Sequence, residues 1–451
     1  MFHPPQADKS GILSALKTED DRTGGFTPKR ATKFFVPLLL QAFSQCLTYP
    51  LVAAIVSHGT LGVKGYAAFA QGQTVMFLIG ALGSGLILTG MVHARTRAGF
   101  LCFRRLNYAM MTVLLAVQLL VTLPPFYGLV FEGVLRLPPE LAAVARNTLG
   151  WGVFMQAAFF LRNEPLVILY NARASFEANL ATTVRLALTV ASSPIFVRMG
   201  WTGPMWGVVA MTGPCFVECA LSYFYARKYL RALPAKDAEG VTHRVADQFR
   251  FTVPLSLGGV LLAVAPLLVA VFVGRTADAV AMLAIHYVTI GVANPVAFGA
   301  LRMQAVAIQF PPEWPGDRRM LVYAACAGLV LGVLPLLFTL PVVADWYFRV
   351  VQNVPVENLW RTRVVMGVYA FAPLLQALRG RLEGLAAWRH RPKLVMAGQV
   401  AHVTTFLAVL ALGLHFGQPG WQMGMTAVLS AAAATIVVLH FTLRARFTRA
   451  G

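Results

Sequence analysis

Two arginines interrupt apolar segments of this chain at places where charge is costly. Arg162 lies in Leu161-Arg162-Asn163-Glu164, and Arg379 lies in the segment LRGRLEG at 378–384. A charged side chain near the centre of a bilayer costs at least ~2.5 kcal/mol, so it must reach an interface, pair with another charge or line a wet cavity. A guanidinium binds carboxylate and phosphate groups through parallel N–H donors. Together the two arginines predict a cavity that binds an anion.

The two arginines lie at similar predicted depths. About three helical turns separate Arg162 from Arg173, and about as many separate Arg379 from Arg389. At ~1.5 Å per helical residue these separations are roughly 16 and 15 Å, and an arginine side chain can span only about half of such a distance. A cavity-facing role is therefore favoured for both. For three other arginines, snorkelling or a helix-to-helix salt bridge is favoured: Arg185, Arg302 and Arg381.

Further polar side chains within the apolar segments complete the predicted site. The predicted substrate-binding residues are Arg162, Arg379, Gln41, Gln45, Asn294, Arg302 and Gln376. The candidates for ion coupling or for salt bridges are Glu164, Glu218, His286 and His402. A salt bridge to an arginine of its own half is as well supported for Glu164 as a coupling role. The histidines either take protons near neutral pH or serve as hydrogen-bonded packing groups.

The motifs of soluble catalysis are absent from the sequence. It contains no glycine-rich phosphate loop, no metal-ligand spacing and no nucleophile beside a credible base. The five cysteines complete no metal set with histidines, and they are interpreted as small buried residues. We therefore expect neither enzyme activity, nor a cofactor, nor a bound metal.

The composition is that of an all-α integral membrane protein. The chain is 57% hydrophobic and 12% charged, compared with about 25% charged residues in an average soluble domain. Apolar runs of about 20 residues recur along it, each long enough to cross ~30 Å of hydrocarbon. They predict twelve transmembrane helices, at 31–56, 65–92, 106–128, 146–171, 179–199, 203–226, 251–274, 279–306, 320–343, 360–387, 393–415 and 420–443. Glycines in the second and tenth spans indicate close helix packing.

The distribution of basic residues predicts the orientation. Most Lys and Arg lie in the N-terminal tail and on alternate connections, whereas the opposite connections hold only Lys64, Arg136, Arg198, Arg275 and Arg349. By the positive-inside rule both termini are cytoplasmic, and an even number of spans agrees. The net charge of +20 is then a topological signal, and no nucleic-acid partner is expected. We predict a multi-pass protein of a bacterial cytoplasmic membrane.

A repeat divides the chain, and its offset is the interval in sequence from Arg162 to Arg379. The first and seventh spans begin with Phe35-Val36-Pro37-Leu38 and Thr252-Val253-Pro254-Leu255, in which Pro37 and Pro254 are separated by this same repeat offset. A duplicated unit with an even number of spans gives two parallel lobes, related by an axis along the membrane normal. The predicted organisation is a cytoplasmic tail (1–30), an N-lobe (31–228), a linker (229–249), a C-lobe (250–445) and a second tail (446–451).

Several of these segments resemble the multidrug/oligosaccharidyl-lipid/polysaccharide (MOP) exporter superfamily. They are the two VPL openings, PLLVAVFVGR at 266–275, NPVAFGALRMQAVAIQF at 294–310 and the Leu-Arg-Gly-x-Leu-x-Gly segment of span ten. Within the superfamily the closest likeness is to the progressive ankylosis proteins. The resemblance implies a V-shaped, MATE-like fold of two lobes with rocker-switch alternating access, and export of pyrophosphate, nucleotides or citrate.

One departure from the superfamily pattern concerns ion coupling. Cation-coupled multidrug extruders of this fold often carry an aspartate in the first span, and the ankylosis pattern also has acids there. This chain has no acidic residue between Lys33 and Ile55, and Gln41 and Gln45 occupy that face instead. The sequence therefore leaves undecided whether transport is coupled to an ion through the N-lobe.

The main hypothesis is a monomeric secondary exporter of small organic or phosphate-containing anions, with H⁺ or Na⁺ as a coupling ion. A multidrug extruder is the first alternative, but it would favour acids in the cavity, where only Glu164 and Glu218 are obvious. A flippase for lipid-linked saccharides is the second alternative, because cavity arginines would suit a pyrophosphate headgroup. A membrane scaffold without transport activity ranks last.

Overall fold

The computed structural model describes residues 26–135, 137–235, 244–311, 318–352 and 354–447. Side chains at 44–51, 53–54, 63–64, 261–262, 266–267, 270, 280, 351 and 445–447 lie outside this description.

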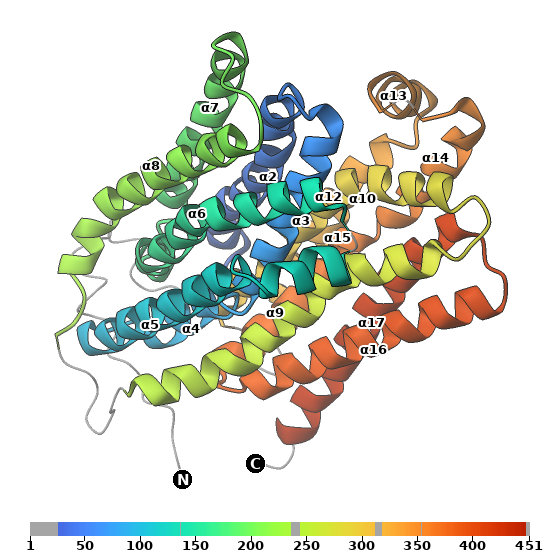
Figure 1. Cartoon of the computed structure of the whole chain (residues 1–451). Helices are drawn as coiled ribbons and strands as arrows, with labels where there is room; N and C mark the ends of the chain where they lie inside the picture. Colours follow the sequence, from blue (N-terminus) through green and yellow to red (C-terminus); the bar gives the residue numbers. More distant parts are fainter. Residues whose placement is uncertain (1–25, 136, 236–243, 312–317, 353, 448–451) are drawn as a thin grey trace. The chain divides into compact units, whose positions relative to one another are not determined.

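The described residues form helices and no strands (Figure 1). The helices of the first half are α2 (Pro28–Ser57), α3 (Gly62–Ala81), α4 (Leu86–His93), α5 (Arg97–Val121), η2 (Gly128–Val134), α6 (Pro139–Asn171), α7 (Ser175–Arg198) and α8 (Pro204–Arg231). Those of the second half are α9 (Val245–Val273), α10 (Ala279–Leu301), α11 (Met303–Gln309), α12 (Arg318–Leu337), α13 (Pro341–Ala344), η3 (Asp345–Val351), η4 (Val356–Asn358), α14 (Leu359–Tyr369), α15 (Ala372–Trp388), α16 (Pro392–His415) and α17 (Gly420–Phe447).

These helices give the twelve predicted spans. Within the described residues, nine helical stretches are long and apolar enough to cross a membrane, and two of them join α3 to α4 and α10 to α11. The remaining three spans are α2, α6 and the pair α14–α15. The last two contain the buried charges described below.

The backbone repeats at the offset predicted from the sequence. Helices η2 and η3 are both π-helical, and their first residues, Gly128 and Asp345, are separated by the repeat offset. Arg173 and His390 are an equivalent pair, and both adopt a left-handed conformation, with φ of 58° and 55°. Gly200 and Gly417 do the same, with φ of 72° and 67°. Because non-glycine residues rarely adopt positive φ, the recurrence at Arg173 and His390 is strong evidence for a duplicated unit.

The contacts between residues divide the described chain into two compact units. Unit 1 contains Ser44–Ser256, and unit 2 contains Phe26–Phe43 together with the chain from Leu257 onward. The beginning of α2 therefore belongs to unit 2, and the beginning of α9 belongs to unit 1. The predicted lobe boundaries at 31–228 and 250–445 stay a prediction.

The centre of unit 1 is α6, which packs against α3, α4, α5, α7 and α8. Glycines on a neighbouring helix allow that helix to pack closely against α6. A Cβ atom on Gly72 of α3 would lie 2.5 Å from the carbonyl oxygen of Ala145 on α6. Polar groups on the inner part of α6 are therefore buried, and other helices of the same unit must provide their partners.

The centre of unit 2 is α15, which corresponds at the repeat offset to the C-terminal half of α6. It packs against α10, α11, α12, α16 and α17, and α16 and α17 lie side by side (Figure 1). A Cβ atom on Gly380 would lie 2.7 Å from the Leu301 carbonyl oxygen, and Gly384 faces α11 at Gln304. The predicted packing role of these two glycines is confirmed.

Candidate functional site

A buried glutamate joins three helices in unit 1. Arg162 Nη1 on α6 lies 3.1 Å from Glu218 Oε2 on α8, and Arg185 Nη1 on α7 lies 3.4 Å from the same oxygen. Thr182, which precedes Arg185 on α7, donates a 2.5 Å hydrogen bond to Oε1. Two guanidinium groups therefore share one carboxylate, and this cluster carries a surplus positive charge.

Arg185 has donor groups that the cluster does not use. Its side chain is 3% exposed, and Nη1 also points to the Cys215 sulfur at 3.8 Å. Nε and Nη2 are buried and have no hydrogen-bond partner among the described residues. Arg162 is more open, with a side chain that is 12% exposed and a guanidinium 5.1 Å from the centre of the Phe159 ring. Unused buried donors are costly, and an anion could satisfy them.

The equivalent arginine of unit 2 lies in a closed network. Arg379 Nε donates to Glu383 Oε1 at 2.8 Å, and Nη2 donates to Gln399 Oε1 at 2.7 Å. Gln399 in turn donates to Glu383 Oε1 at 2.7 Å, and Gln304 of α11 donates to Oε2. One cation meets one anion here, so the charges balance.

The repeat explains why the two clusters differ. At the repeat offset Arg185 corresponds to His402 and Glu218 corresponds to Thr435. His402 Nδ1 lies 3.2 Å from Thr435 Oγ1, so a hydrogen-bonded pair in unit 2 takes the place of the Arg185–Glu218 ion pair. The acid of unit 2 lies instead on α15 as Glu383. At the four positions 162, 185, 379 and 402, unit 1 has two arginines and unit 2 has one; Arg381 of α15, at the repeat position of Glu164, is a further buried arginine of unit 2.

Glu164 has a different environment from the other two buried glutamates. It is 2% exposed and makes no ion pair within the described part of the chain. Tyr223 Oη donates to its Oε2 at 3.0 Å, while Oε1 has no hydrogen-bond partner among the described groups. The salt bridge considered for Glu164 is not formed with any residue that the structure describes.

The other predicted residues differ in their exposure. Gln41 and His286 are buried at 1% and 3% exposure, Asn294 is exposed and Gln376 is half-buried. Arg302 lies over the Phe298 ring at 5.0 Å. Gln45 is outside the described side chains. All of these except Gln45 belong to unit 2, whereas Arg162, Glu164 and Glu218 belong to unit 1, so a shared cavity for Arg162 and Arg379 stays a prediction.

Besides Arg185, four residues of the clusters were missing from the predicted site: Thr182, Gln304, Glu383 and Gln399. Glu383 pairs with Arg379, and the other three donate to the buried carboxylates. The local sequence does not mark these donors, but the repeat links Thr182 to Gln399 at the same offset as the two arginines. Among the described residues, no group of three His, Cys, Asp or Glu is placed to hold a metal ion.

Comparison with known proteins establishes the fold. No family model and no curated protein sequence matches the chain. Among solved structures, the Vibrio cholerae MATE transporter VcmN in its bent form is similar with a TM-score of 0.68 and 13% identity, over 93% of this chain and 97% of that one. A MOP superfamily transporter from Pyrococcus furiosus has a TM-score of 0.66 and 15% identity, over 93% and 96%.

The eukaryotic MATE transporter AtDTX14 is similar over 92% of this chain and 95% of its own, with a TM-score of 0.67 and 12% identity. These coverages extend over almost the whole chain. They confirm the predicted fold, which is that of the MATE transporters, with twelve helices in two lobes. The finer likeness to progressive ankylosis proteins stays a prediction.

Proposed function

We propose that this chain is a secondary membrane exporter that carries small organic or phosphate-containing anions by rocker-switch alternating access. Citrate, pyrophosphate and nucleotides are anions of the proposed kind. The transporter part of the proposal is supported by the fold, because the similar structures are of MATE and MOP superfamily transporters. We further propose a monomer in a bacterial cytoplasmic membrane, with both termini in the cytoplasm.

The surplus charge around Glu218 supports an anionic substrate. Two arginines share that carboxylate at 3.1 and 3.4 Å, and Arg185 keeps two buried nitrogen atoms without partners in the described chain. A carboxylate or phosphate that accepted from Arg185 Nε and Nη2 would balance the charge and satisfy both donors. Burial strengthens such a contact because the local dielectric constant is low.

The roles of the two units differ in this proposal. Arg185 in unit 1 keeps two buried nitrogen atoms without partners among the described residues, whereas Arg379 in unit 2 uses Nε and Nη2 to bind Glu383 and Gln399. We therefore assign first contact with the anion to Arg162 and Arg185. The predicted contributions of Arg379, Gln41, Gln45, Asn294, Arg302 and Gln376 remain part of the proposal.

Transport by reconstituted protein tests the substrate class. Proteoliposomes would be assayed with labelled citrate, pyrophosphate and ATP, and with a cationic dye. The key variant is Arg185→Gln, which leaves Arg162 and Glu218 as a balanced pair and is therefore expected to fold. We expect it to lose anion transport by at least about tenfold, the effect of one lost charge-assisted contact.

Lys228→Gln provides the matched control. It removes the same charge from α8, but Lys228 is 59% exposed and pairs with Glu177 at 3.5 Å. We expect its anion transport to equal that of the unchanged protein. Dye transport without any anion transport would overturn the proposed substrate class.

A cation-coupled multidrug extruder is the second candidate, and Glu164 favours it. This glutamate is buried and has no cationic partner among the described residues, so it could exchange a proton or meet a cationic substrate. Glu164→Gln can keep the hydrogen bond from Tyr223 through the amide oxygen. Loss of dye transport in this variant, with anion transport absent throughout, would select the second candidate.

A further inference from the structure

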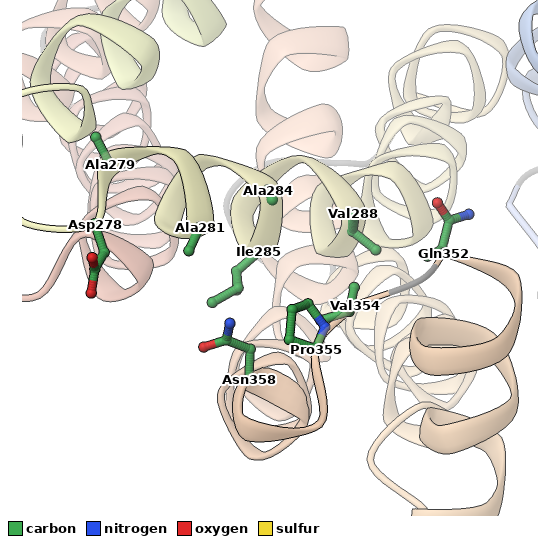
Figure 2. A pocket seen from close by; sticks show the side chains of 10 residues that line it. All are labelled: Asp278, Ala279, Ala281, Ala284, Ile285, Val288, Gln352, Val354, Pro355 and Asn358. Atoms are coloured by element: carbon green, nitrogen blue, oxygen red, sulfur yellow. The ribbon is translucent and has the colours of Figure 1, made fainter.

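Unit 2 contains a cavity whose lining includes no residue of the two arginine clusters. Its volume is about 560 Å³, within the range of about 300–1,000 Å³ typical of small-molecule sites. Figure 2 shows it between α10 and the segment that joins η3 to η4. Ile285 and Val288 of α10 line one wall, and Val354 and Pro355 line the other. These walls suit an apolar ligand body.

Two polar side chains at this cavity, those of Asp278 and Asn358, have polar atoms that are available to a ligand. Asp278 precedes α10 and is exposed; its carboxylate caps no helix nitrogen and has no ion pair among the described residues. Asn358 is 4% exposed, and its Oδ1 accepts from Arg361 Nη1 at 2.7 Å. Its Nδ2 points toward Ile285 in Figure 2, where a ligand acceptor could meet it.

The internal repeat shows that the fold does not need these polar groups. Asp278 and Leu61 are the N-cap residues of the equivalent helices α10 and α3. Asn358 corresponds to Leu141 at the repeat offset, and their backbone nitrogens donate to the equivalent prolines at 2.9 and 3.0 Å. Gln352, which also lines the cavity, corresponds to Leu135. Three positions that are leucine in unit 1 are therefore polar in unit 2.

Charge defines the ligand class. Asp278 is the one residue with a formal charge among the described residues that line the cavity. The nearby Arg361 is engaged by Asn358 and lies over the Trp360 ring at 5.6 Å. A ligand with a cationic group at Asp278 would gain a charge-assisted contact, whereas an anion there would be repelled.

We propose that this cavity is a second binding site, for amphiphilic ammonium compounds. The ammonium group lies at Asp278, the apolar body contacts Ile285, Val288 and Pro355, and an acceptor oxygen meets the Asn358 amide. Both a free aryl or alkyl amine and the headgroup of an aminophospholipid have this chemistry. The site is independent of the anion-transport proposal, because it uses none of the same residues.

Binding of 4-phenylbutylammonium to the full chain tests the site. The protein is placed in nanodiscs of phosphatidylcholine alone, and titration calorimetry compares this amine with the neutral 4-phenylbutanol. We expect Asp278→Asn to weaken amine binding by at least about tenfold, and Ala284→Trp, which fills the cavity, to abolish it. Because Asp278 is exposed, its variant is expected to keep its fold, and its anion transport is expected to be unchanged.

Asp345→Asn is the matched control. It removes the same charge from η3, but Asp345 is paired with Arg349 at 2.8 Å and does not line the cavity. Its affinity for the amine should equal that of the unchanged protein. Equal affinity in Asp278→Asn, or equal binding of the amine and the alcohol, would overturn the proposal.

Nanodiscs that contain phosphatidylethanolamine distinguish the two sources of the ammonium group. If the lipid headgroup occupies the site, this lipid weakens binding of 4-phenylbutylammonium to the unchanged protein, and Asp278→Asn removes the competition. Absence of competition, with amine binding still dependent on Asp278, assigns the site to free amines.

Discussion

Thr182 on α7 and Gln399 on α16 are equivalent residues of the repeat, and each donates a hydrogen bond to the buried glutamate that pairs with the central arginine of its own unit. Thr182 donates to Glu218 at 2.5 Å, and Gln399 donates to Glu383 at 2.7 Å. The glutamates themselves are not equivalent, because one lies on α8 and the other on α15. The two halves of the repeat thus keep the position of the arginine and of the donor but vary that of the acid.

This relationship predicts a large loss of stability when Glu218 is neutralised. Glu218→Gln leaves two buried guanidinium groups without a counter-charge, which is expected to lower the free energy of unfolding by about 3–5 kcal/mol. Unfolding in detergent or bicelles would measure it. Glu177→Gln is the control, since its pair with Lys228 is partly exposed and is worth only about 0–1 kcal/mol. Equal losses in the two variants would contradict the shared ion pair.

In unit 2 the ion pair is expected to be strongly coupled. Arg379 and Glu383 are 2% and 0% exposed and lie 2.8 Å apart, so removal of either one alone leaves a buried charge and costs about 3–5 kcal/mol. The double variant Arg379→Met, Glu383→Met removes both charges of the pair. A double-mutant cycle should therefore give a loss smaller than the sum of the single losses, whereas additive losses would show that the two charges do not interact.

Much of the architecture could be predicted from the sequence, because hydropathy and basic residues are local signals. The twelve spans and the repeat offset needed only apolar runs and a few recurrent residues. The Arg379–Glu383 pair also had a local signal, since residues four apart lie on one face of a helix. This pair leaves the cavity-facing role of Arg379 a prediction.

The partners of Arg162 had no such signal. Arg162 and Glu218 are 56 residues apart on different helices, and their contact depends on which faces of α6, α7 and α8 pack together. Arg185 was expected to snorkel or to form a salt bridge, and it forms the salt bridge. Periodicity cannot supply such pairings when helices are apolar all round.

Close packing between α15 and α11 predicts a steric effect at Gly380. A methyl group there would lie 2.7 Å from the Leu301 carbonyl oxygen, so Gly380→Ala is expected to cost about 1–3 kcal/mol through displaced backbone. Gly291→Ala on α10 makes the same change where no atom lies within 4 Å. That control should be neutral, or more stable by up to about 1 kcal/mol. Thermal unfolding of both variants would measure the difference, and similar midpoints would contradict the packing.

The number of spans between two exposed residues predicts their accessibility from each side of the membrane. Ala235 follows α8 and Phe416 follows α16, and both are exposed. Five spans separate them: α9, α10–α11, α12, α14–α15 and α16. An odd number puts the two residues on opposite sides, and the positive-inside rule places Ala235 in the cytoplasm.

Cysteine labelling tests this orientation. Ala235→Cys and Phe416→Cys would each be made in a chain without the five native cysteines and treated with a membrane-impermeant maleimide. Intact cells should label only the variant at Phe416, and inside-out vesicles only the variant at Ala235. The reverse pattern would contradict the orientation predicted from charge while keeping the span count. Labelling of both from one side would contradict the count itself, because five crossings cannot return the chain to the side from which it started.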